Sequence, residues 1–529
     1  MKKLFVCALA LAAFVACDNG PEGGVEVNEN GKVFLKFSIS AVTRSATDNA
    51  GESNSDANPD IEVGFPEENK VSTVDIVMSA NGANLVVAEN VAPEAADDTY
   101  VATFKSNSLQ PNTQYQVLVY VNGKGQQTLD AVYNVTEDNL RETIAKDEYF
   151  LMTNADNDNK VSFTESELAQ CTSPDKALAL GTIMVERAVA RFDFMPRFNN
   201  EYTIGENEGT ATVQVKLTDL ALINMSKAFY YMRRVSPTGT AEGATVGGDE
   251  LMNNYVVDTD AAEKVNASKM EGEALATLSE NNFFYPMTTI PTNWTKISDL
   301  NKVDNWDGTY GSDKDDKYNH TGEALNDYLV WRYAIENTIP AGADNQVHAI
   351  STGVVFKGYL MATENASDEV KAALKGTETV YVFKNVLYGT WAQIADAVDA
   401  DTAPASLIAA YNQVEGVDGE PTADDYAAAG FTGYTPNADG KFEVLYYYWN
   451  RHNDNNNDNL MGIMEFDVVR NNVYKLCVDK ISKFGHPAND TDPDPDPVDP
   501  EDPDESQDYY FKVTVKVLPW VVRVNHIEF

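Results

Sequence analysis

Cysteine is scarce in this chain of 529 residues, which contains only four. Two of them, Cys171 and Cys477, lie beyond the first 17 residues. A disulfide framework of the kind that holds small secreted domains together needs more cysteines in a shorter chain. The fold must therefore be held by burial of apolar side chains. We expect both cysteines to be buried thiols, and the sequence leaves a single bridge between them open.

Basic residues are also few, because 39 Lys and Arg stand against 82 Asp and Glu and give a formal net charge of −43. Proteins bind the phosphates of nucleic acids through clustered Lys and Arg side chains. This charge balance excludes nucleic acid as a partner. A strong charge of one sign also keeps a protein soluble before it assembles.

The usual catalytic motifs are absent. The chain has no Gly-x-Ser-x-Gly, no glycine-rich phosphate loop, no His-Glu-x-x-His and no Cys-x-x-Cys. Its five histidines are scattered, and paired carboxylates carry no information in so acidic a chain. We therefore predict that the protein is not an enzyme and needs no cofactor, apart from the calcium considered next.

One acidic run has the oxygen spacing of an EF-hand calcium loop. Its candidate ligands are Asn154, Asp156, Asp158, Ser162 and Glu165. Asn159 stands at the sixth position, where glycine is usual and where asparagine tolerates the left-handed turn. The residues before the loop have the pattern of a strand, whereas an EF-hand has a helix there. A polar surface turn is therefore the favoured interpretation, and a calcium site is the alternative.

No long apolar run follows the first residues. Lys2 and Lys3 precede an apolar stretch from Leu4 to Ala16, which is too short to span a bilayer and is typical of a secretory signal peptide. Cys17 follows it as in a lipobox, and residues 18–29 form a polar tether. We predict a signal peptide at 1–17, lipidation (palmitate) of Cys17, export through the periplasm and an outer-membrane lipid anchor.

The next segment has the alternation of a half-buried strand. Val33, Leu35, Phe37 and Ile39 share one face, and polar residues share the other. Arg44 and Ser45 follow, and a polar run from 46 to 60 comes next, which is where a trypsin-like protease would cut. We predict a propeptide at 18–44 that is released by cleavage between Arg44 and Ser45, with Lys36 as a weaker alternative site.

Most of the remaining chain has the pattern of short strands separated by Asn, Gly, Pro and Asp clusters. This pattern predicts a mainly β protein with two tandem β-sandwich domains, at 45–190 and 191–486, and a few helical insertions. Expected strands are 71–78, 85–88, 100–104, 114–121, 182–194, 212–222, 354–361, 380–387, 442–449 and 464–478. Expected helices are 164–170, 368–374, 391–398 and 405–412.

The C-terminus repeats the pattern of the first strand. Residues 487–508 are a spacer rich in Asp-Pro repeats, which cannot join a sheet and stays extended. Residues 509–529 then alternate between apolar and polar, with one apolar face formed by Phe511, Val513, Val515 and Val517 and, after the interruption at Pro519, a second apolar stripe formed by Trp520, Val522 and Val524. If the first strand is removed, a neighbour's C-terminal strand can fill the open groove by β-augmentation. Ordinary terminal strands of one sandwich are the alternative interpretation.

Several motifs resemble the major subunit of the minor (short) fimbriae of Bacteroidales, a type V pilin of the fimbrillin superfamily. They are the run 465–476 with Arg470-Asn471-Asn472-Val473-Tyr474, the preceding 446–449, the Asp-Pro spacer, the closing Pro519-Trp520 and 527–529, and the stretch 185–191. Residues 230–350 carry no part of this resemblance.

The resemblance implies transthyretin-like sandwiches, lipoprotein export, removal of the segment up to Arg44 by an Arg-specific protease, and insertion of a neighbour's C-terminal donor strand. It implies a fimbrial shaft subunit that polymerises with copies of itself and supports adhesion, biofilm formation and virulence. Its implied partners are accessory anchor and tip subunits and host or bacterial surface receptors.

Aromatic residues in the middle of the chain favour a different function. Six of them lie close together in the sequence: Trp294, Trp306, Tyr310, Tyr318, Tyr328 and Trp331. Such a set can form a carbohydrate-binding face, although aromatics of this kind are more often core or loop anchors. The alternative function is therefore a monomeric surface lipoprotein that binds glycans.

Overall fold

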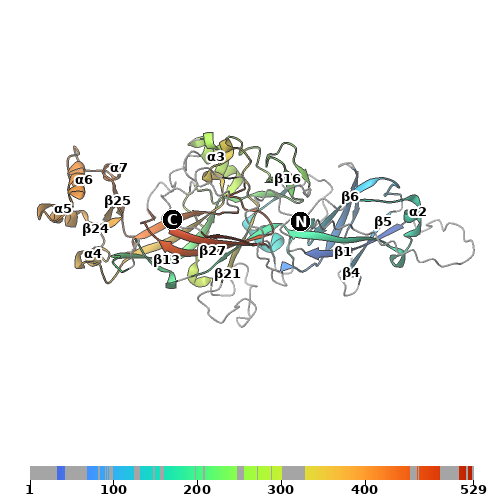
Figure 1. The fold of residues 1–529 in the computed structure, drawn as a ribbon, viewed down its shortest axis with the longest axis horizontal. Helices are drawn as coiled ribbons and strands as arrows, with labels where there is room; N and C mark the ends of the chain where they lie inside the picture. The colour runs from blue at the N-terminus through green and yellow to red at the C-terminus, as the bar shows by residue number, and fades with distance from the viewer. Residues whose placement is uncertain are drawn as a thin grey trace, which may run out of the picture.

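The computed structural model describes residues 32–41, 68–488, 511–519 and 522–526. Within 68–488 it leaves out a set of loops and single residues: 81–83, 90, 92, 95–98, 106, 124–131, 147–148, 155–159, 197, 206–208, 247–254, 271, 288, 301–327, 453–461 and 463. The molecule is elongated, with strands β1, β5 and β6 near one end and helices α4–α6 at the other (Figure 1). The fold is mainly β, as predicted.

The N-terminal part is built on one large sheet. Its strands lie in the order β3-β2-β6-β8-β10-β1-β5-β4, and β9 pairs with β6. Their bounds are β1 Lys32–Ala41, β2 Val74–Ala80, β3 Asn84–Ala88, β4 Pro93–Glu94, β5 Thr99–Lys105, β6 Gln114–Val121, β8 Met152–Asn154, β9 Lys160–Ser162 and β10 Leu178–Arg187. Helix α2 (Glu165–Gln170) is capped by Thr164, which accepts from the backbone of Glu167.

The strand predicted over 182–194 is wrong at Ala188, because the chain changes sheets there. β10 pairs with β8 and β1, whereas β11 (Val189–Phe194) pairs with β21 (Leu329–Ile335) and β27 (Asn472–Ile481). The Ala188 N–H donates to the Leu151 carbonyl across 2.9 Å. Both strands are buried on both faces near the switch, so no change in periodicity marks it in the sequence.

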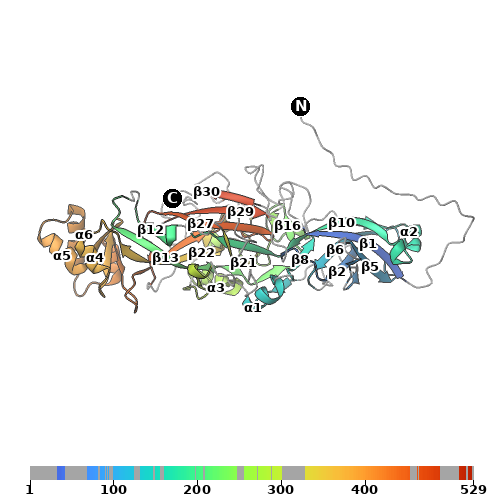
Figure 2. The same ribbon diagram turned by 90° about the horizontal axis from the view of Figure 1, so that it is seen from below.

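Two further sheets form the central part, and Figure 2 shows their strands running along the molecule. One has the order β21-β11-β27-β29-β30, with β29 at Phe511–Pro519 and β30 at Val522–His526. The other has the order β12-β13-β22-β26-β28 with β20 beside β13: β12 Glu201–Thr203, β13 Val213–Ile223, β20 Thr295–Lys296, β22 Gly353–Ala362, β26 Glu443–Trp449 and β28 His486–Pro487. Phe194 and Phe356 pack across these two sheets with ring centroids 5.6 Å apart.

Residues between β13 and β21 form smaller elements over these sheets. They pair as β14 (Met225–Ser226) with β19 (Phe283–Phe284), and β16 (Arg234–Ser236) with β17 (Thr245–Val246) and β18 (Tyr255–Val256). Helix α3 spans Glu273–Asn282. β15 (Ala228–Tyr230) pairs with β7 (Val132–Asn134) of the N-terminal part, near helix α1 (Glu137–Asn139) and the π-helix at Leu140–Ile144.

The segment between β22 and β26 is a small helical unit, part of which has a separate core and part of which packs into the main core. It holds α4 Asp368–Ala373, α5 Trp391–Asp399, α6 Ala405–Glu415 and α7 Ala423–Ala428 around the sheet β24-β23-β25, at Val386–Thr390, Val380–Phe383 and Phe431–Tyr434. The strand predicted over 380–387 is wrong because Lys384 and Asn385 take positive φ angles of 49° and 61°, which turn it into a β23–β24 hairpin. The three helices predicted here are confirmed as α4, α5 and α6.

A second strand prediction, over 464–478, is wrong in its first half. Only residues from Asn472 onward are strand, and Met464 and Asn471 have positive φ angles of 61° and 60°. The buried side chains between them make hydrogen bonds that hold the segment as a packed loop, which periodicity alone does not predict.

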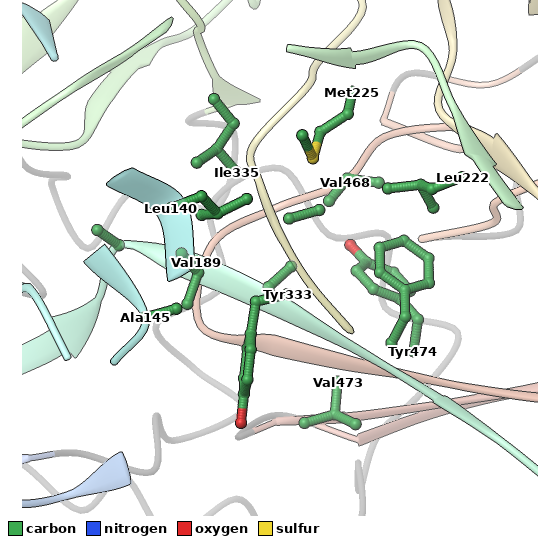
Figure 3. Close-up of a cluster of buried hydrophobic side chains, with 14 of the residues drawn as sticks. Leu140, Ala145, Val189, Leu222, Met225, Tyr333, Ile335, Val468, Val473 and Tyr474 are labelled. Carbon is green, nitrogen blue, oxygen red and sulfur yellow. The ribbon is translucent and has the colours of Figure 1, made fainter. Parts of the chain in front are cut away.

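One continuous cluster of buried apolar side chains extends from the N-terminal sheet through the two central sheets. Figure 3 shows Leu140, Val189, Tyr333, Val473 and Tyr474 converging where the N-terminal sheet gives way to the next. Both Cys171 and Cys477 are buried thiols, as expected, so the bridge left open between them is not formed. Among the described residues, no helix is both long and apolar enough to cross a membrane.

Candidate functional site

Strand β1 lies inside the N-terminal sheet. It pairs parallel with β10 on one side and antiparallel with β5 on the other. The side chains of Val33, Leu35, Phe37 and Ile39 are all 4% exposed or less. The predicted strand is therefore present, and its apolar face is fully covered by the domain.

The partners of β1 are equally buried. Phe37 stacks on Tyr100 of β5 with ring centroids 6.3 Å apart, and Leu35 lies opposite Ala102. The Phe34 N–H donates to the Cys171 carbonyl across 3.1 Å, at the end of α2. If β1 were absent, β5 and β10 would each present an unpaired edge, with an apolar trough between them.

The C-terminal strands lie on their own chain. β29 pairs antiparallel with β27, from Asn472 opposite Pro519 to Ile481 opposite Phe511, and β30 pairs with β29. We expected the spacer to carry this tail away from its own chain, and here the tail folds back instead. Within the described sheet, β27 is the strand that pairs with the tail, so the tail occupies the edge of this sheet.

Several predicted site residues lie outside the described residues. They are Cys17, the cleavage pair Arg44 and Ser45, the spacer beyond residue 488, and Trp520. Lipidation, cleavage and the domain bounds 45–190 and 191–486 stay predictions.

The first described residue after β1 is Glu68, which is fully buried. Its carboxylate accepts from Arg191 Nη1 at 3.0 Å and from the Tyr333 hydroxyl at 2.6 Å. Arg191 also binds Asp193 through two hydrogen bonds of 2.9 Å. The Glu68 backbone carbonyl accepts from Arg187 Nε at 3.0 Å. This Glu68 cluster ties the chain that follows the predicted cleavage site to strands β10, β11 and β21.

The sequence did not reveal the Glu68 cluster. Arg187 and Arg191 lie in the stretch 185–191 that carries part of the resemblance, and Glu68 stands in a polar run that looks exposed. The available signal was a pair of arginines inside an otherwise apolar stretch, because buried arginines require carboxylate partners. Which carboxylate fulfils that need depends on the topology.

The motif Arg470-Asn471-Asn472-Val473-Tyr474 forms a buried joint in the structure. Arg470 Nε lies 2.7 Å from Glu336 Oε2, and its other nitrogens donate to the carbonyls of Tyr230 and Tyr231. Asn471 Oδ1 accepts from Arg187 Nη1 at 2.9 Å. Burial raises the pKa of Glu336, and the nearby Arg470 guanidinium only partly offsets it. The motif therefore links the end of β10 to β27 and to the small β15 strand.

The candidate calcium loop is only partly described. Asn154 is buried, and its carboxamide is occupied by β6, since Oδ1 accepts from Val119 N–H at 2.5 Å and Nδ2 donates to the Val117 carbonyl at 2.8 Å. Ser162 ends β9 and Glu165 begins α2. Asp156 and Asp158 lie outside the described residues. In the part of the chain that the structure covers, no group of three or more His, Cys, Asp or Glu residues could hold a metal.

The six aromatics considered as a glycan face are not brought together on one surface in the described chain. Trp331 is 1% exposed and packs on Phe192 in the core. Trp294 lies against Lys357 and Tyr328 against Lys475, on different elements. Trp306, Tyr310 and Tyr318 lie outside the described residues. A denser aromatic cluster, which the sequence analysis missed, joins Tyr381, Trp391, Tyr411, Tyr426 and Phe431 in the helical unit.

One region of the chain matches a known protein family. Residues 441–526 match the family described as major fimbrial subunit protein type IV, Fimbrillin, C-terminal. This range includes β26, the Arg470 joint, β27, β29 and β30.

Similar solved structures include a fimbrilin (fimA) from Porphyromonas gingivalis, at 15% identity and a TM-score of 0.35, with 95% of this chain and 100% of that chain covered. Another is the C-terminally truncated tip fimbrial protein Mfa3 from Porphyromonas gingivalis, at 10% identity and a TM-score of 0.30, with 86% and 97% covered. Both TM-scores are below 0.5, so the assignment of residues 441–526 rests on the family match alone. That match confirms, over residues 441–526, the resemblance to fimbrillins that the motifs indicate.

Proposed function

We propose that this protein is the structural shaft subunit of a cell-surface fimbria. In this proposal, β1 is removed by cleavage after Arg44, and the C-terminal strand of a neighbouring subunit takes its place. The subunit reaches the surface as a lipoprotein anchored through Cys17, and the polymer supports adhesion and biofilm formation. Its partners are copies of itself, anchor and tip subunits, an Arg-specific protease and surface receptors.

The observation that carries this proposal is the position of β1. It lies between two strands of a sheet, and its four inward side chains are almost completely buried. Its only covalent link to the rest of the domain passes through the segment that contains Arg44. Cleavage there would convert a central strand into a non-covalently held peptide.

The energetics favour replacement of the lost strand. Burial of a large apolar side chain contributes ~1.5–3 kcal/mol, so four of them contribute on the order of 10 kcal/mol before ordering costs. The vacated trough also has two unpaired sheet edges. An incoming strand with the same alternation satisfies both, and Phe511, Val513, Val515 and Val517 have that alternation.

The present position of the tail is compatible with such a transfer. Among the described residues, β29 pairs with β27 on one side and with β30 of the same tail on the other. In its present position β29 pairs with β27 of its own chain. In the trough left by β1 it would lie between β5 and β10, which adds a second ladder of backbone hydrogen bonds. Because donor and acceptor lie on different parts of the chain, the contact does not close on itself, and it builds a filament.

The test is gel electrophoresis without boiling, before and after limited digestion with an Arg-specific protease. We expect a ladder of high-mass species only after the cut, and none with Arg44→Ala or with residues 509–529 deleted. The tail deletion should still be cut at Arg44, which separates maturation from assembly. A monomer band that persists despite a verified cut would overturn the proposal and favour the glycan-binding monomer.

A further inference from the structure

A lysine is completely buried in the central part of the molecule. Lys264 is 0% exposed, and its Nζ lies 2.5 Å from Asp258 Oδ2, 2.7 Å from Asp260 Oδ1 and 2.7 Å from Asn337 Oδ1. It also donates to the Thr338 carbonyl at 2.9 Å. The ring of Phe283 covers it, with the centroid 5.4 Å away. The amine is therefore held in a dry pocket against a side-chain carboxamide.

The carboxamide of Asn337 is fixed on its other side. Its Nδ2 donates to the carbonyls of Asn224 at 3.2 Å and Ile350 at 3.0 Å, and to Thr352 Oγ1 at 3.0 Å. Only Oδ1 faces the lysine. Lys264 Nζ is therefore held at a fixed orientation beside the carboxamide, 2.7 Å from Oδ1, and such positioning gives the large effective concentration that a slow amide exchange requires.

The surrounding carboxyl groups can carry protons. Asp258 Oδ1 has no hydrogen-bond partner, although the side chain is buried. Burial, followed by repulsion from Asp258, raises the pKa of Asp260 well above its usual range. Asp467 lies in the same region, and burial raises its pKa in the same way. The site therefore combines an ion pair with carboxyl groups whose pKa values are raised by burial.

We propose that Lys264 and Asn337 form an intramolecular isopeptide bond, with Asp258 as the proton acceptor. Lys264 Nζ first gives a proton to Asp258 Oδ2, and its lone pair then attacks Cγ of Asn337. The Cγ–Nδ2 bond breaks as the protonated carboxyl group supplies a proton to Nδ2. The amide nitrogen of the new bond gives its extra proton back to the Asp258 carboxylate, which passes it to the departing ammonia. One lysine ammonium and one asparagine carboxamide are thus converted into one secondary amide and one ammonium ion, without oxidation or reduction.

The protonation state of the Lys264 amine determines the rate of this step. Burial alone would lower the pKa of Lys264, but the two carboxylates beside it outweigh burial and raise that pKa. The amine is therefore protonated most of the time, and the transfer to Asp258 must come first. Because each chain reacts only once, a small neutral fraction is sufficient. We therefore expect the bond to form slowly, after folding.

The cross-link would close a loop from Lys264 to Asn337. This loop contains α3 and the segment 301–327. Any backbone cut between the two residues would then leave the pieces covalently joined. Such a bond suits a protein exposed to proteases and to pulling forces outside the cell.

Tryptic peptide mapping of the full purified chain tests the proposal directly. Acylated Lys264 resists trypsin, so the expected product is a branched peptide that joins 235–269 to 333–357 and weighs one ammonia less than the sum of its parts. Tandem mass spectrometry should place the branch at Lys264 and Asn337. Two separate unmodified peptides, in protein aged for several days after folding, would overturn the proposal. So would a loss of water that maps to Lys264 and either aspartate.

Variants add a second check. Lys264→Arg keeps the charge and cannot form the bond, so the branched peptide should disappear. Lys269→Arg is the matched control, because that lysine is 60% exposed in a surface ion pair with Asp344; the branched peptide should persist in it. If Lys264→Arg does not fold, the wild-type peptide map alone still decides.

Discussion

The Arg191 guanidinium lies 3.0 Å from the Glu68 carboxylate, and both side chains are withdrawn from solvent. This pair joins the first described residue after β1 to a strand of the next sheet. The chain at Glu68 is therefore held by the central sheet through β11 and β21.

Glu68→Ala should destabilise the protein strongly. It removes the acceptor of both Arg191 and the Tyr333 hydroxyl and leaves buried donors behind. Breaking a buried ion pair from one side costs ~3–5 kcal/mol. Urea unfolding measures the change. Glu201→Ala is the control, because its ion pair with Lys216 is 36% exposed on each side, and an exposed pair contributes no more than ~1 kcal/mol. Equal losses in both variants would contradict the role of the cluster.

Phe37→Ala should destabilise the uncleaved protein by ~3–5 kcal/mol, since it empties a site stacked on Tyr100. Lys36→Ala, on the opposite face of β1, should change stability much less. The distinguishing measurement comes after cleavage at Arg44 and assembly. Polymers of Phe37→Ala and wild type should then have the same thermal stability, because β1 has left. A difference that persists would show that β1 remains bound.

Val515→Asp should abolish assembly, because an ionised side chain cannot enter an apolar trough without a large desolvation cost. Thr514→Asp is the matched control, since residue 514 belongs to the other face of the alternating tail. Gels of cleaved protein should show a ladder for Thr514→Asp and monomer for Val515→Asp. Monomer in both variants would point to a general effect of charge, and a ladder in both would argue against the tail as donor.

His452 should make the protein sensitive to acid. Burial lowers its pKa from 6.5 to about 3, and its Nδ1 lies 2.8 Å from the Tyr474 hydroxyl. The unfolded chain takes up a proton near pH 6.5, whereas the folded chain does so only near pH 3. The free energy of unfolding therefore falls by up to ~1.4 kcal/mol per pH unit as the pH falls through this window.

The variant His452→Gln should lose this part of the pH dependence. Asp260 and Asp467, whose pKa values are raised, act in the opposite sense, but they are present in both proteins and cancel in the difference. Urea unfolding between about pH 7 and pH 4 measures the slopes. Parallel curves for His452→Gln and wild type would contradict the prediction.

Strands with clear alternation were predictable from the sequence. The strand expected over 114–121 coincides with β6, and the apolar face of β1 is buried as the period of two indicates. Helices α4, α5 and α6 were also predicted, because apolar periodicity and an N-cap such as Ser367 or Thr390 mark their starts. These features depend on residues close in sequence.

The errors fall where distant residues decide the outcome. The sheet switch at Ala188 and the packed loop before Asn472 depend on partners more than a hundred residues away. The buried charges Glu68, Glu336 and Lys264 could not be found for the same reason. Glu68 and Lys264 stand in stretches that look exposed and Glu336 follows an apolar strand, and only the topology brings their partners within hydrogen-bond distance.

The helical unit at the end of the molecule has one more consequence. The chain leaves β22 at Ala362 and returns on β26 at Glu443, and these strands are paired neighbours with Tyr359 opposite Glu443. The entry and exit points are thus fixed by the sheet, and closing a longer loop between them costs little, about 0.6 kcal/mol per doubling of its length. Loops within residues 363–442 are therefore a natural site for grafting an epitope, provided that the residues of this segment that join the main core, such as Val370, Val380 and Tyr434, are kept.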